Sequence, residues 1–125
     1  MISKEEVLII HNEVVSTHGG ASGIREINGL ESAISRPFQL FEGVELYTSV
    51  FEKAAAIGES IIMNHPFIDG NKRTGYVLME TVLRMEGLKI SAPDDSLYDF
   101  VIKITTGEIR FDQIVDWLKQ NTSAL

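Results

Sequence analysis

The chain contains no cysteine. This absence excludes disulfides, thiolate nucleophiles and thiolate metal sites, so any catalysis must use histidine, carboxylate, hydroxyl or backbone groups. The chain also lacks an apolar run of about 18 residues, the length at which a membrane-spanning helix becomes a candidate. Its first residues, MISKEEVLII, lack the basic start and long apolar core of a signal peptide. We therefore expect no membrane insertion and a cytoplasmic location.

Positive charge is scarce as well. The sequence has 11 Lys and Arg against 18 Asp and Glu, for a formal net charge of −7. Because binding to a polyanion relies on Lys and Arg displacing counterions, we expect no direct nucleic-acid binding. Nevertheless Lys72 and Arg73 lie close to His65 in a short segment of this acidic chain. A local cationic pocket of this kind suits a small phosphorylated ligand.

The length of 125 residues predicts one domain, residues 1–125, with a single core. Apolar residues recur at helical spacing in most of the chain, which predicts an all-α, compact helical bundle. Ser3 and Glu6 form a capping-box pattern at the start of the first helix. The helices are expected at residues 4–17, 29–35, 47–64 and 71–86, from 94 through 104, and from 111 through 118 before a frayed tail.

The segments between these helices contain few strand signals. Residues 19–28 hold Gly19, Gly20, Gly23 and Asn28, so we expect a loop or short hairpin there that could act as a flap, with Asn28 starting the next helix. Residues 38–46 are expected to be irregular, and residues 88–91 are the other weak strand candidate. The helix at 47–64 is apolar around most of its circumference, which predicts the central buried helix.

The segment HPFIDGNKR, residues 65–73, lies between two helices that are expected in the core. A helix start exposes unpaired N–H groups and the positive end of the helix dipole, so Gly70, Asn71, Lys72 and Arg73 at such a start predict a phosphate site. Gly70 allows close backbone approach, and Asn71 can cap the helix and donate its amide to a phosphate oxygen. Arg73 offers a planar fork for phosphate and Lys72 a compact charge.

Two further residues of this segment complete a candidate catalytic site. Asp69 is a hard oxygen ligand of the kind that holds Mg²⁺ together with nucleotide phosphates. Histidine is the side chain whose unperturbed pKa lies near neutrality, so His65 is the candidate general base for an incoming hydroxyl. Pro66 and Phe67 are expected to be structural, Pro66 by stiffening the turn and Phe67 by anchoring the loop in the core.

Each of these residues alone has a simpler interpretation. A single histidine between helices is usually structural, Asp69 could only cap a helix, and Lys72 with Arg73 could be a solvated pair. Their combination in one short segment favours the functional interpretation. A zinc site at His65 and Asp69 lacks a third nearby ligand. We expect His11 and His18 to be surface residues of the first helix and Trp117 to lie in the core.

HPFIDGNKR matches every position of the Fic/Doc signature, H-x-F-x-(D/E)-(G/A)-N-(G/K)-R, and GIREINGLESAISRP resembles the corresponding upstream segment of Doc-type toxins. The chain therefore resembles the Fic/Doc family, whose members transfer AMP from ATP or, in Doc-type members, the γ-phosphate. AMP-transferring members usually continue G-N-G-R-x-x-R, whereas Lys72 and Tyr76 replace the glycine and the second arginine here. The resemblance implies that ATP binds in the reversed orientation. It also implies that His65 activates a Ser or Thr hydroxyl of the target protein, which faces the γ-phosphate. Gly70 instead favours AMP transfer, since AMP-transferring members have glycine at this position.

By this resemblance the target is translation elongation factor Tu, and its modification arrests protein synthesis. The autoinhibitory motif (S/T)-x-x-x-E-(G/N) of many Fic enzymes is absent, because Phe38 and Val82 stand four residues before the two Glu-Gly pairs. Restraint is therefore expected from a Phd-like antitoxin whose disordered tail folds on binding. Two alternatives stay open, namely Fic-type AMP transfer to a protein hydroxyl and a catalytically inactive nucleotide- or protein-binding module.

Overall fold

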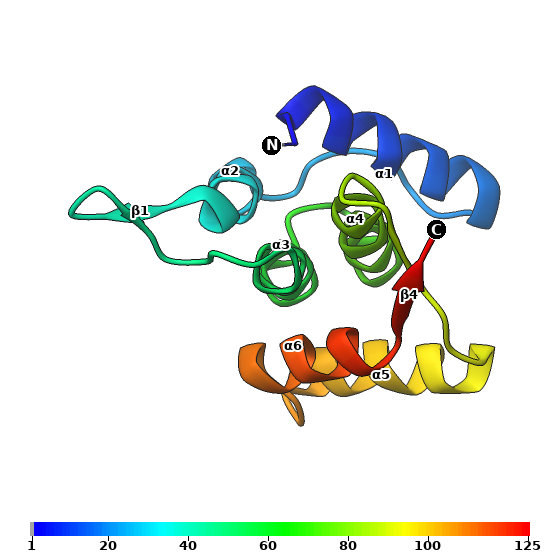
Figure 1. The fold of residues 1–125 in the computed structure, drawn as a ribbon. Helices are drawn as coiled ribbons and strands as arrows, with labels where there is room; N and C mark the ends of the chain where they lie inside the picture. The colour runs from blue at the N-terminus through cyan, green and yellow to red at the C-terminus, as the bar shows by residue number, and fades with distance from the viewer. Residues whose placement is uncertain (1) are drawn as a thin grey trace.

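The computed structural model describes residues 2–125 and is all-α, as the sequence predicts (Figure 1). Among the described residues the helices are α1 (Lys4–His18), α2 (Ile27–Ser35), α3 (Val50–Asn64), α4 (Asn71–Arg84), α5 (Asp94–Thr106) and α6 (Phe111–Gln120), with a 3-10 turn η1 (Arg36–Phe38). Two small antiparallel pairs join β1 (Leu40–Phe41) to β2 (Val44–Glu45) and β3 (Leu88–Ile90) to β4 (Thr122–Ala124). No helix within residues 2–125 combines the length and apolar character needed to cross a membrane.

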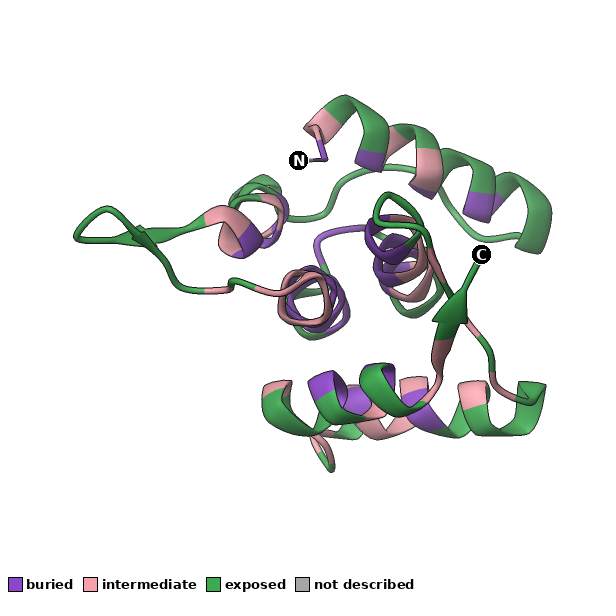
Figure 2. Ribbon diagram, viewed as in Figure 1, coloured by how far each residue is buried: buried purple, intermediate pink, exposed green. Residues whose placement is uncertain are grey.

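Helices α3 and α4 form the centre of the molecule. Helices α1 and α2 lie on one side of this pair and α5 and α6 on the other (Figure 1). All residues of α3 from Ala54 to Ile62 are buried, which confirms it as the central helix, and burial concentrates along the central pair (Figure 2). The candidate site segment joins these two helices. Its two ends are therefore held by the central helices α3 and α4.

Two glycines let α3 and α4 approach closely. A Cβ atom added to Gly58 of α3 would lie 2.3 Å from Cγ of Met79, and one added to Gly75 of α4 would lie 2.6 Å from Cγ1 of Ile62. A core packed to the density of a crystal has no room for either Cβ atom. The spacing of the two helices, and with it the span of the loop between them, therefore depends on these glycines.

Replacing Gly75 with alanine should lower the free energy of unfolding by about 1–3 kcal/mol, because the added methyl group overpacks the contact between α3 and α4. Urea denaturation measures this change. Gly29→Ala is the matched control, since a Cβ atom there would lie 3.4 Å from its nearest neighbour, Cγ of Glu26. The control should be neutral or stabilising by up to about 1 kcal/mol. Equal destabilisation by both substitutions would contradict the close approach at Gly75.

The short strands differ from the sequence expectations. The hairpin β1–β2 lies in residues 38–46, which were expected to be irregular, and it projects away from the helices (Figure 1). Residues 19–26 form a loop with one isolated bridge, between Ile24 and Phe67, and α2 already begins at Ile27. The strand expected near residues 88–91 is confirmed as β3. The expectation of a frayed tail is wrong, because β4 pairs with β3 and the Leu125 amide donates to the Gly87 carbonyl.

Helix starts agree within a few residues, but the cap expected for α2 is wrong. Helix α1 begins with the predicted capping box, in which Ser3 and Glu6 bond each other's backbone amides. Helix α2 is capped by Glu26, whose carboxylate accepts from the Asn28 amide, so Asn28 is not the cap. A glutamate competes for this position here because its side chain can fold back onto the first turn.

An ionic cluster formed by Glu59 of α3, Arg36 and Arg110 connects α3 to its neighbours. Glu59 is 5% exposed and accepts from Arg36 at 2.9 Å and from Arg110 at 3.2 Å. The guanidinium of Arg36 also lies over the rings of Tyr47 and Phe111. Burial opposes the charge of Arg36, but the hydrogen bonds with Tyr47 and Glu59 outweigh it, so the pKa of Arg36 is raised. The cluster connects η1, α3 and the residue before α6.

Candidate active site

The loop that joins α3 to α4 begins at His65, which ends α3 in a left-handed conformation with φ 48° and ψ 55°. Positive φ is uncommon for residues other than glycine and needs support from the surroundings. Arg25 gives that support, since its Nε donates to the His65 carbonyl at 2.8 Å and its second nitrogen to the Asn64 carbonyl at 3.1 Å. The backbone of His65 is therefore held independently of its side chain.

The imidazole of His65 is exposed and makes no hydrogen bond to other residues in the range 2–125. A general base must be reachable by the hydroxyl that it deprotonates, and this side chain meets that condition. The catalytic role of His65 stays a prediction. The structure places its side chain on the exposed surface of a loop whose backbone is held by Arg25.

Phe67 anchors the loop as expected, being 1% exposed. Its amide donates to Oδ1 of Asn71, and its carbonyl accepts from Nδ2 of Asn71, both at 3.0 Å. The side-chain amide of Asn71 is thus committed to the loop backbone. The expectation that Asn71 caps the helix is wrong, because Gly70 is the N-cap, at φ 81°, and Asn71 is the first helical residue. The backbone amide of Asn71 remains one of the donors at the helix start.

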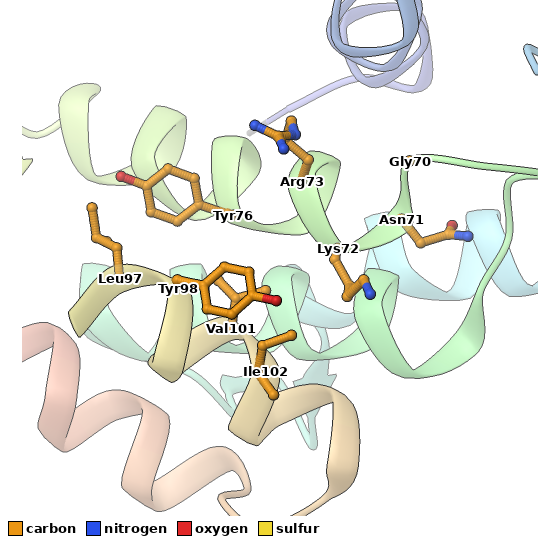
Figure 3. A pocket seen from close by; sticks show the side chains of 9 residues that line it. All are labelled: Gly70, Asn71, Lys72, Arg73, Tyr76, Leu97, Tyr98, Val101 and Ile102. Carbon is orange, nitrogen blue, oxygen red and sulfur yellow. The ribbon is translucent and has the colours of Figure 1, made fainter. Parts of the chain in front are cut away.

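The start of α4 keeps the features of an anion site. No side chain caps it, so the first-turn amides of residues 71–73 point outward without intrahelical partners. Lys72 and Arg73 are exposed, and within residues 2–125 neither side chain forms a hydrogen bond or an ion pair. Uncapped amides, a helix dipole and two unpaired cations on the first turn of one helix favour binding of phosphate, although Lys72 and Arg73 extend from different sides of α4 (Figure 3).

Asp69 lies directly before this helix start. Its Oδ2 accepts from the Ala21 amide at 2.8 Å, which leaves Oδ1 without a hydrogen bond to the part of the chain that the structure describes. No group of three or more His, Cys, Asp and Glu side chains within residues 2–125 could enclose a metal. One exposed carboxylate beside a candidate phosphate site fits Mg²⁺, which binds through few carboxylates and the phosphates of its nucleotide.

Residues 19–28, the flap expected from the sequence, lie along the site loop. The Ile68 amide donates to the Gly23 carbonyl at 3.1 Å, and the Arg25 amide donates to the Pro66 carbonyl at 2.7 Å. These bonds and the bridge from Ile24 to Phe67 make the two segments a short antiparallel pair. The glycines allow this close approach, since Gly20 and Gly23 have φ values of 113° and 120°.

His11 is the residue that the sequence interpretation placed wrongly. It was expected on the surface, yet it is 1% exposed, and its ring stacks on Phe67 with centroids 3.7 Å apart. A signal was present, because His11 follows Val7 by four residues and precedes Val14 by three, which places it on the buried face of α1. His18 is exposed as expected, and Trp117 is partly buried, stacked on Phe100 at 3.8 Å.

A cavity of about 420 Å³ opens between the start of α4 and the side of α5, within the range of small-molecule sites. In Figure 3, Lys72 and Tyr98 extend into the space between the two helices, while Asn71 points away from it. The cavity is lined by Gly70, Asn71, Lys72, Arg73, Tyr76, Leu97, Tyr98, Val101 and Ile102. It therefore has a cationic end at α4 and an aromatic and aliphatic wall, which suits a ligand with phosphates at one end and a flat apolar group at the other.

Tyr76 forms part of that wall. Its hydroxyl donates to Oε2 of Glu80 at 3.3 Å. Burial, together with the nearby charge of Glu80, raises the pKa of Tyr76 to about 12. The phenol therefore stays neutral near pH 7, so at this position the cavity offers an uncharged aromatic surface rather than a cation.

Comparison with known proteins identifies the family of the chain. The family model described as "Fic/DOC family" matches residues 1–83. The chain is 33% identical over 98 residues to "Toxin Doc" of Mycolicibacterium smegmatis, a match that covers 77% of this chain and 75% of the relative. It is 31% identical over 120 residues to "Protein kinase doc" of Escherichia phage P1, covering 95% of this chain and 93% of that protein. A family match over more than half of its length and a relative aligned almost end to end show that the chain belongs to the Fic/DOC family.

Proposed function

We propose that the protein is a Doc-type toxin that transfers the γ-phosphate of ATP to a Ser or Thr hydroxyl of a translation factor, elongation factor Tu. The observation that carries this proposal is the exposed His65 on a fixed loop that leads into an uncapped helix start with two unpaired cations, Lys72 and Arg73. The name of the phage P1 relative, a protein kinase, supports phosphate transfer.

The phosphates of ATP bind at the start of α4 in this proposal. The backbone amides of residues 71–73 donate to phosphate oxygens. The planar guanidinium of Arg73 makes a bidentate contact with phosphate, and Lys72 adds a point charge. Asp69 is the carboxylate that would hold Mg²⁺, which when bound neutralises phosphate charge during transfer. Gly70 contributes its left-handed N-cap conformation, which leaves the amides uncovered.

The nucleoside occupies the cavity between α4 and α5. Tyr76 and Tyr98 give its base aromatic surfaces, and Leu97 with Val101 gives apolar ones. The neutral Tyr76 stands where AMP-transferring relatives carry their second arginine. A phosphate clamp is thereby replaced by an apolar wall, which favours a nucleotide in the reversed orientation, with its γ-phosphate towards His65.

The chemical step is an in-line displacement at phosphorus. His65 accepts the proton of the target hydroxyl, and the hydroxyl oxygen forms a bond to the γ-phosphorus. The bond from that phosphorus to the bridging oxygen breaks, and ADP leaves with the bond electrons. Arg73 and Lys72 stabilise the negative charge that spreads over the transferring group.

AMP transfer is the second candidate, and Gly70 favours it because AMP-transferring relatives have glycine at that position. In that reaction the hydroxyl attacks the α-phosphorus and pyrophosphate leaves. A module that binds nucleotide or protein without turnover is the remaining alternative, and it predicts no transfer at all.

Labelled ATP separates these reactions. The protein is incubated with Mg²⁺, a bacterial extract and ATP labelled at either the γ- or the α-phosphate, with chelated Mg²⁺ as the control. Label from the γ-position alone, dependent on Mg²⁺, is the expected result. Label from the α-position would establish AMP transfer instead, and no label from either position would favour the binding module.

A Phd-like antitoxin is the second proposed partner. Support comes from the relative named Toxin Doc and from the lack of an autoinhibitory motif in this sequence. Expression of the protein alone should slow bacterial growth, and coexpression with the product of an adjacent small reading frame should restore it. Normal growth without that product, together with no binding to it, would contradict the toxin–antitoxin assignment.

A further inference from the structure

His11 connects α1 to the candidate active site through two contacts. Its ring stacks nearly parallel on Phe67, at an interplanar angle of 7°, and its Nε2 lies 2.8 Å from the Asp69 carbonyl oxygen. A carbonyl oxygen only accepts, so Nε2 must carry the proton and donate it. This bond joins residues 58 positions apart in the sequence, with the histidine 1% exposed.

The contact fixes the residue that would hold the metal. The main chain of Asp69 is tied to His11, and its carboxylate is tied through Oδ2 to the Ala21 amide. Asp69 is thus held on both sides, and Oδ1 is left for another ligand. Nε2 of His11 also lies 3.7 Å from the place that a Cβ atom on Gly70 would take, so the imidazole borders the N-cap of α4.

We infer that His11 is a positioning residue that sets the Asp69 carboxylate in place for a Mg²⁺-bound nucleotide. The inference rests on the proposed function, because it needs ATP and Mg²⁺ at this site. Residues that orient a metal ligand from behind typically change metal affinity by about 10–100-fold when they are lost. A histidine that only fills the core would instead change stability and leave the effect of Mg²⁺ on nucleotide binding untouched.

Variants at position 11 separate the hydrogen bond from the packing. His11→Phe keeps an aromatic ring against Phe67 but has no donor, and His11→Met fills similar volume without one. His11→Gln loses the ring but keeps a donor. His18→Phe, on the exposed side of the same helix, is the matched control. Thermal unfolding of each variant shows whether it is folded.

The readout is the binding of a non-hydrolysable ATP analogue, measured by calorimetry with and without Mg²⁺. In the unaltered protein Mg²⁺ should strengthen binding. In His11→Phe this strengthening should fall about tenfold or more, with affinity in the absence of Mg²⁺ unchanged. His11→Gln should recover most of the loss, and His18→Phe should show none. If His11→Phe does not fold, His11→Met gives the same comparison.

The results that would overturn the inference are distinguishable from one another. If the donor-free variant keeps the full effect of Mg²⁺, or if His11→Gln is as impaired as that variant, His11 acts through packing only. If the unaltered protein binds no ATP analogue, the proposed function fails and the inference falls with it. If Mg²⁺ does not change the affinity of the unaltered protein for the ATP analogue, Asp69 has no metal-binding role and His11 has no positioning role.

Discussion

Replacing His65 with alanine should lower the rate of phosphate transfer by about 10²–10⁴-fold while leaving ATP binding intact. The imidazole is exposed and has no hydrogen-bond partner in residues 2–125, so its removal disturbs no packing. The loop conformation is held by bonds from Arg25 to the backbone of residues 64 and 65. Single-turnover transfer of label and calorimetric ATP binding measure the two effects separately.

The left-handed backbone at His65 requires a second variant. Alanine at a positive φ carries a conformational cost of about 1–2 kcal/mol, which could loosen the loop. Asparagine tolerates this conformation better and cannot act as a base near neutral pH. His65→Asn should therefore be as inactive as His65→Ala. Transfer at the unaltered rate in either variant would remove the general base from the mechanism, and unchanged growth arrest would favour the binding module.

Replacing Arg73 with alanine is the other change with a large expected effect. Transfer should fall by about 10²–10³-fold, the loss typical when one preorganised donor to the developing charge is removed. Arg73 is exposed and unpaired in the described part of the chain, so it has no structural partner to lose. Arg73→Lys should recover only part of the rate, because lysine cannot make the bidentate contact.

Arg84→Ala is the matched control for Arg73→Ala. Arg84 lies in the last turn of α4, is exposed, and is 4.0 Å from a carboxylate oxygen of Glu80. The control removes the same charge from the same helix, far from its N-terminal end. Transfer by Arg84→Ala should stay within about twofold of the unaltered rate, since exposed ion pairs contribute little. An equal loss in both variants would mean that net charge, and not a phosphate contact, is responsible.

Much of the fold could be predicted because its signals are local. Apolar residues at helical spacing give the helices, and the capping box at Ser3 gives the start of α1. The site segment could be predicted for the same reason, since His65 through Arg73 are consecutive in the chain. A glycine and two cations at an expected helix start indicate a candidate anion site from the local sequence alone.

What could not be predicted depends on contacts between distant residues. The role of Asn71 follows from a turn that brings its amide onto the backbone of Phe67, which a capping rule does not foresee. Strand β4 forms only because α5 and α6 return the chain to β3. The sequence of β4 lacks the apolar alternation that marks a strand by itself, whereas Leu88, Lys89 and Ile90 of β3 have it.

His11 and Glu59 show the same limit for polar residues in the core. Polarity alone predicts exposure for both, and both are buried because partners far away in the sequence satisfy them. For His11 the partner is the carbonyl of Asp69, and for Glu59 the partners are Arg36 and Arg110. Helical spacing places His11 on the inner face of α1, but nothing local names the group that it meets.

The most direct test uses purified components. Elongation factor Tu is incubated with the protein, ATP and Mg²⁺, and the intact mass of the factor is then measured, with the His65→Ala variant as the control. The mass should rise by one phosphoryl group with the unaltered protein and stay constant with the variant. A rise by one adenylyl group, or no rise at all, would contradict phosphate transfer to this factor.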